Sequence, residues 1–110
     1  MNTSEIEMEL RWYKGTIIGK LSKYQNNVPA LQLYTPEGEP ISRASVNLPE
    51  FPPMDSIWIK NYSENEGMVK ALVEAGWIDE NYTKVVISGY ETIEAYPMTG
   101  ELLELWKNYK

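Results

Sequence analysis

Hydrophobic and polar residues alternate with a period of two along the start of the chain. Apolar side chains occupy every second position over residues 6–12, with Glu or Arg between them, which is the pattern of a strand with one buried face. The β-branched run 15–24 continues extended, and Lys14-Gly15 between the two runs fits either a turn or a bulge. Two further strand-like runs flank the segment PEGEP, where Gly38 suits a positive φ angle. These runs predict a β-hairpin over residues 30–48.

The apolar period changes to that of a helix in the second half. Four apolar side chains at helical spacing form one stripe: Met68, Val69, Leu72 and Val73. Ser63 suits the N-cap position, and Glu66 three residues later completes a capping box. Gly76 and Trp77 suit the C′ and C″ positions of a Schellman cap. The pattern therefore predicts a helix over residues 63–75.

The last third of the chain predicts strands and a second helix. Residues 84–96 are β-rich, with Gly89 at a bend or bulge. Apolar residues then fall on one helical face over residues 100–109, with Thr99 in the N-cap position. The prediction is one α+β domain over residues 1–110: an antiparallel sheet of four to six strands, the central helix packed on one face, and a short C-terminal helix.

The charge limits the kinds of partner. Ten Lys and Arg against 16 Asp and Glu give a net charge of −6, and the basic residues are scattered along the chain. A scattered basic set disfavours direct binding to nucleic acid, whereas a protein partner with a basic surface is attracted. No apolar run reaches the length of a membrane span, and the absence of Cys fits a reducing compartment. We therefore expect a cytoplasmic protein, monomeric or homodimeric, that binds no membrane.

Few groups for catalysis remain. The chain has no His and no Cys, so imidazole and thiolate metal sites and the usual nucleophile–base pairs are excluded. Neither glycine-rich phosphate-loop motif occurs. We therefore expect no catalytic residues, no cofactor and no metal, and a protein that is not an enzyme. A carboxylate-based enzyme or a small-ligand module remains as the alternative.

Candidate contact residues cluster where a short strand leads into the predicted helix. Amphipathic rings are common, with four Trp and eight Tyr against one Phe, and such rings favour protein interfaces. The candidates combine rings, carboxylates and an amide: Trp58, Tyr62, Glu64, Asn65 and Glu66. Gly67 beside them would let a partner's backbone approach closely. The competing interpretation, that residues 63–66 only cap the helix, stays open.

The segments SVNLPEF, IKNYSENEGMVKALVEAGWI and SGYETIEAY together resemble a group of small uncharacterised proteins that phages, plasmids and conjugative elements encode in bacteria. The match covers about residues 30–96 and is most specific over residues 60–67. The resemblance implies no activity. It implies a setting, the accessory genes of mobile elements, among which anti-defence and anti-CRISPR inhibitors are common.

Two functional hypotheses therefore compete. The first is a non-enzymatic inhibitor or modulator that binds the basic surface of a host nucleic-acid-handling or defence protein, such as a defence nuclease. The second is the carboxylate enzyme or small-ligand module. A concave pocket lined by converging polar groups would favour the second hypothesis, and an exposed acidic and aromatic patch without a pocket would favour the first.

Overall fold

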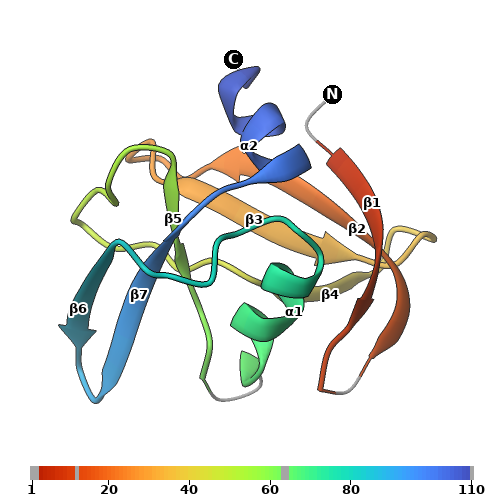
Figure 1. The fold of residues 1–110 in the computed structure, drawn as a ribbon, viewed down its shortest axis with the longest axis horizontal. Coiled ribbons are helices and arrows are strands. Elements are labelled where there is room, and N and C mark those ends of the chain that lie inside the picture. The colour runs from red at the N-terminus through yellow and green to blue at the C-terminus, as the bar shows by residue number, and fades with distance from the viewer. Residues whose placement is uncertain (1–2, 12, 63–64, 110) are drawn as a thin grey trace.

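The computed structural model describes residues 3–11, 13–62 and 65–109. Within these ranges, seven strands and two helices form an α+β fold (Figure 1). One antiparallel sheet has the order β1 (Thr3–Glu9), β2 (Lys14–Lys23), β3 (Pro29–Tyr34), β4 (Pro40–Arg43). A second has the order β5 (Ser56–Ile59), β7 (Glu91–Pro97), β6 (Lys84–Ser88). The helices are α1 (Met68–Glu74) and α2 (Gly100–Lys107). The predicted class is confirmed, and the strands are divided between two sheets.

The hairpins follow the local sequence signals. Glu9 pairs with Lys14, so the chain reverses between them, and Lys14-Gly15 is neither a turn nor a bulge but the start of β2. The predicted hairpin of β3 and β4 is confirmed, with Gly38 at a φ angle of 94° in its turn. Trp12, expected to continue the first alternation, falls outside the described residues. Neither described helix is long and apolar enough to cross a membrane.

Two hydrophobic clusters lie on opposite faces of β5. Ile57 and Ile59 join the main core, which β2, β3, α1 and α2 also line. Trp58 points to the other face and is fully buried in a second cluster with Ile93 of β7. Leu48, in the proline-rich connection between β4 and β5 (residues 44–55), belongs to the same cluster. The Trp58 indole N–H donates to the carbonyl of Glu50 at 2.9 Å. The second face of this strand is therefore covered by the chain itself.

Helix α1 begins at Met68, five residues later than the predicted start at residue 63. Gly67, with a φ angle of 92°, is its N-cap and provides no side-chain bond. Instead, Asn61 Oδ1 accepts a hydrogen bond from the Val69 N–H at 2.9 Å. Ser63, the predicted N-cap, lies outside the described residues. The left-handed backbone at Gly67 cannot belong to a helix interior, so the capping-box prediction was wrong.

The other end of α1 is as predicted. Gly76 has a φ angle of 77°, its N–H donates to the Val73 carbonyl, and the Trp77 N–H donates to the Leu72 carbonyl, both at 3.0 Å. These are the two bonds of a Schellman motif. Trp77 is 1% exposed, and a Cβ added at Gly19 of β2 would lie 2.5 Å from its ring. The indole therefore packs directly on the backbone of β2.

Helix α2 is also confirmed and is attached at the same corner. Thr99 is its N-cap, with an extended backbone, and its hydroxyl donates to the Gly76 carbonyl at 3.0 Å. The Thr99 N–H donates to the Trp77 carbonyl at 2.8 Å. An isolated antiparallel β-bridge between Ile78 and Met98 lies next to these two hydrogen bonds. The end of α1 and the start of α2 are thus held together.

Gly19→Ala should lower the free energy of unfolding by about 1–3 kcal/mol, the usual cost of overpacking a core, because its methyl group would meet the Trp77 ring. Urea unfolding measures this loss. Ser22→Ala, in the same strand and half-buried, is the matched control and should change stability by less than about 0.5 kcal/mol. Equal stability of the two variants would show that the Trp77 ring does not touch this strand.

Asn61→Ala should destabilise the protein by about 1 kcal/mol, because the Val69 N–H at the start of α1 loses its acceptor. Thermal unfolding followed by far-ultraviolet circular dichroism measures the change. Asn108→Ala, an exposed amide at the end of α2, serves as the control. If both variants melt together with the wild type, the Asn61 side chain does not cap this helix.

Candidate functional site

The predicted contact residues do not share one surface. Trp58 is fully buried and Asn65 is 3% exposed, so neither can be part of a contact surface, and both are corrections to the predicted set. Glu64 lies outside the described residues. Tyr62 is half-buried and Glu66 is exposed, so these two remain accessible.

Asn65 joins the strand-to-helix junction to β4. Its Oδ1 accepts a hydrogen bond from the Ser42 hydroxyl at 2.6 Å, and its Nδ2 donates to the Arg43 carbonyl at 2.7 Å. A buried amide is stable only when its polar atoms are bonded, and Asn65 meets that condition. Asn65 therefore has a structural role that neither interpretation of this segment included.

Tyr62 lies among cations rather than carboxylates. The Lys60 ammonium is 5.7 Å from its ring centre, and the Arg43 guanidinium is 5.7 Å from the ring of Tyr24. These four side chains line a shallow cleft of about 280 Å³. Tyr62 and Glu66 thus face different surroundings, and the sequence cluster does not form one acidic aromatic patch.

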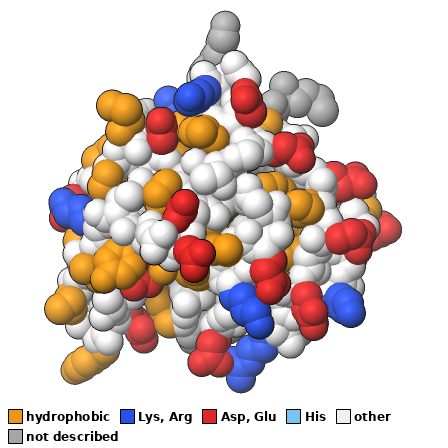
Figure 2. Space-filling model, in the orientation of Figure 1, with side chains coloured by type: hydrophobic (Ala, Val, Ile, Leu, Met, Phe, Trp, Pro, Cys, Tyr) orange, Lys and Arg blue, Asp and Glu red, His pale blue; other side chains and the backbone are white. Residues whose placement is uncertain are grey.

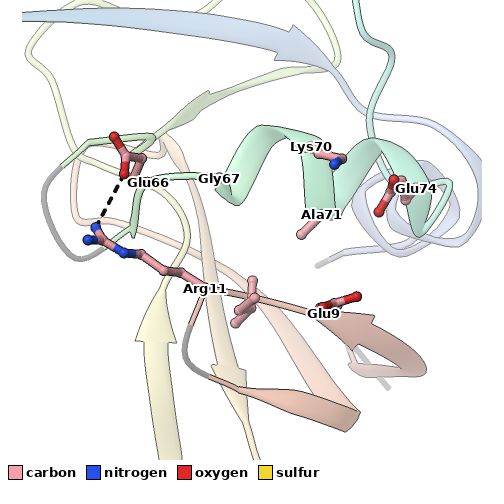
Figure 3. Close-up of a pocket in the computed structure, with 8 residues that line it drawn as sticks. Glu9, Arg11, Glu66, Gly67, Lys70, Ala71 and Glu74 are labelled. Carbon is pink, nitrogen blue, oxygen red and sulfur yellow. Dashed lines mark ion pairs between the residues drawn. The ribbon is translucent and has the colours of Figure 1, made fainter.

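Glu66 lies at a larger cleft, of about 390 Å³, between the end of β1 and α1 (Figure 3). Its lining residues are Glu9, Leu10, Arg11, Glu66, Gly67, Lys70, Ala71 and Glu74. Leu10 and Ala71 are buried and form an apolar floor. Across the mouth, Arg11 Nη1 and Glu66 Oε1 form an ion pair at 3.3 Å. The lining contains three carboxylates and two cationic side chains, so the rim of the cleft has a net negative charge.

The chemistry of this cleft suits binding better than catalysis. Its lining includes no hydroxyl or thiol nucleophile. All three of its carboxylates are exposed, whereas a carboxyl group that must act as an acid near neutral pH is usually held in an apolar site. Within the described ranges, no group of three or more Asp or Glu could hold a metal ion.

The acidic rim continues along β1. Glu5, Glu7 and Glu9 occupy alternate positions on its exposed face, and Glu9 also lines the cleft. We call the five carboxylates of β1 and the cleft the acidic face: Glu5, Glu7, Glu9, Glu66 and Glu74. The sequence pattern contained this row, which was interpreted only as the polar side of a strand. Figure 2 shows acidic side chains gathered on the side of the molecule where β1 lies.

Hydrophobic side chains gather on the opposite side, over β6 and β7 (Figure 2). Ile87 is 81% exposed, and Val85, Tyr82 and Tyr90 are also exposed. Beside them, the Tyr96 hydroxyl donates to Glu94 Oε1 at 2.7 Å. Burial raises the pKa of Tyr96, and the bond to the Glu94 carboxylate raises it further.

Comparison with protein-family models, with curated proteins and with solved structures found no match.

Asn65→Ala should cost about 1–3 kcal/mol of folding stability, because the Ser42 hydroxyl and the Arg43 carbonyl lose a buried partner. Chemical denaturation provides the measurement. Glu66→Ala, the neighbouring control, removes only an exposed ion pair and should cost less than about 1 kcal/mol. A neutral effect of Asn65→Ala would show that its two hydrogen bonds do not stabilise the junction with β4.

Proposed function

We propose that the protein acts by binding another protein, without catalysis, and that the acidic face is its contact surface. The observation that carries this proposal is the continuity between the carboxylates of β1 and those of the cleft, which share Glu9. Like-charged side chains placed side by side are unfavourable for the isolated protein, because they repel one another. Their field becomes favourable when a surface of opposite charge approaches.

The partner suited to this face is a protein with a basic surface. Complementary charge accelerates association and selects against acidic partners. Proteins that handle nucleic acids carry such surfaces, because Lys and Arg neutralise phosphates. An acidic protein bound there would block the nucleic acid. We therefore propose a host nucleic-acid-handling or defence protein, such as a nuclease, as the target.

The resemblance to proteins of mobile elements agrees with this proposal, since anti-CRISPR-like inhibitors belong to the same setting. The absence of Cys fits action in the reducing bacterial cytoplasm. The alternative, a carboxylate enzyme or small-ligand module, has the 390 Å³ cleft as its nominal site. The exposure of its three carboxylates makes that cleft better suited to meeting a partner's cations.

Neutralising part of the acidic face should slow association with the target. Wild-type protein is immobilised and exposed to a bacterial host lysate at low salt, and retained proteins are identified by mass spectrometry. Association rates of the purified target are then measured. Glu5→Gln with Glu9→Gln should lower the rate by about tenfold, because steering charges act chiefly on association.

A matched control removes the same charge elsewhere: Glu91→Gln with Glu104→Gln, both at exposed positions. This control variant should associate with the target at the wild-type rate. Added salt should slow association of the wild type more than that of the Glu5→Gln, Glu9→Gln variant. Equal association rates for the two double variants, or the retention of acidic proteins only, would contradict the proposal.

A further inference from the structure

Strand β6 is a sheet edge with little of the usual protection. It lies at the end of the order β5–β7–β6, and no described strand pairs with its outer side. Exposed edges are normally protected by charge, proline or a covering segment. The β1 edge carries three Glu, and β5 is bridged on its outer side by the contact between Ser45 and Ile59. By contrast, β6 has the sequence KVVIS, with one charge at its start.

The turn between β6 and β7 sets which backbone groups face outward. Ser88 pairs with Glu91 across a two-residue turn, in which Gly89 has a φ angle of 63°. A β-turn hydrogen bond joins the first and fourth residues, so Ser88 directs its backbone groups toward β7. Hydrogen-bonded and non-hydrogen-bonded residue pairs alternate along an antiparallel ladder, so the backbone groups of Val86 also point toward β7. The N–H and C=O groups of Val85 and Ile87 therefore point outward, away from β7.

We infer that β6 pairs in antiparallel fashion with β6 of a second copy, about a two-fold axis at Val86. In this register Val85 lies opposite Ile87 of the second copy, and the reverse pair is identical. Each such pair can exchange both backbone bonds, because both residues direct their polar groups outward. The two three-stranded sheets would then form one continuous sheet of six strands.

The side chains fit the same register. Residues directly opposite in an antiparallel pair share a face, so the exposed Val85 and Ile87 of both copies would form one apolar cluster. On the other face, Lys84, which also forms an ion pair with Glu50 of its own copy, would lie opposite Ser88 of the second copy. The same row contains Glu91 of the second copy. Opposite charges in one row favour this arrangement over a parallel one.

The distribution of charge favours this end of the molecule for self-association. Copies with a net charge of −6 repel one another most where their carboxylates meet. Strand β6 carries one charged residue, Lys84, which forms an ion pair with Glu50, whereas the acidic face lies on the other side of the molecule. Pairing through β6 therefore keeps the two acidic faces apart and leaves both accessible. The inference does not depend on the identity of any other partner.

The expected dimer is weak. Stable specific interfaces bury about 1,200–2,000 Å² in total, and a pair of five-residue strands with their side chains lies at or below that range. Sedimentation velocity from about 1 µM to about 1 mM, the range over which weak complexes dissociate, should show monomer giving way to dimer. A chain that remains monomeric throughout overturns the inference.

Ile87→Lys tests the surface. A lysine on the edge removes apolar contact and places two like charges on either side of the two-fold axis, so the dissociation constant should rise at least tenfold. Met54→Lys is the control, because Met54 is equally accessible, at 89% against 81% for Ile87, and lies in the proline-rich connection. Both positions are exposed, so both variants should fold with wild-type circular dichroism. Equal dimerisation of the two variants overturns the inference.

A disulfide tests the register in a chain with no native Cys. The two-fold axis places the two Val86 side chains directly opposite, in a non-bonded pair whose Cβ atoms are about 4.5–5.5 Å apart. Val86→Cys should therefore oxidise to a covalent dimer faster than Met54→Cys under the same mild oxidant. Equal rates for the two cysteine variants would exclude this axis.

Discussion

The contact between the Trp77 indole and the bare backbone of Gly19 fixes how α1 meets the larger sheet. A side chain at that position of β2 would displace the ring. The same corner accepts both bonds from Thr99, so α2 and the end of β7 are attached there as well. Three segments that are distant in the sequence are thus held in place by contacts among a few neighbouring residues.

This arrangement has an energetic cost. Trp77 Nε1 is buried, and no described residue accepts a hydrogen bond from it. An unsatisfied buried donor costs about 1–3 kcal/mol. Burial of an indole removes a large apolar area from water, which offsets that cost. With β2, α1 and β7 held at this corner, the hairpin of β6 and β7 extends beyond it and forms the apolar end of the molecule.

Signals confined to neighbouring residues could be predicted from the sequence. The hairpin turn at Gly38, the Schellman end of α1 at Gly76 and the N-cap at Thr99 each depend on a few consecutive residues, and each is confirmed. The start of α1 could not be predicted in this way. Its position depends on Asn61 and on the bonds of Asn65 to β4, more than 20 residues away in sequence.

The candidate site was less predictable for the same reason. The composition of the junction around Tyr62 indicated a contact surface, but whether a side chain is buried depends on what covers it. Trp58 is covered by Leu48 and Val28, which no local pattern assigns to it. By contrast, the carboxylates of β1 and the single charge of β6 were visible in the sequence as alternation and composition. Their significance depends on which strands lie at sheet edges.

Amide hydrogen exchange resolved to single residues tests most directly whether the corner around Trp77 is rigid and the edge strand β6 is open. In dilute protein the Trp77 amide, bonded to the Leu72 carbonyl, should exchange only through global unfolding, whereas the amides of Val85 and Ile87 should exchange quickly. A Trp77 amide that exchanges as fast as that of Ile87 would contradict this description of the fold.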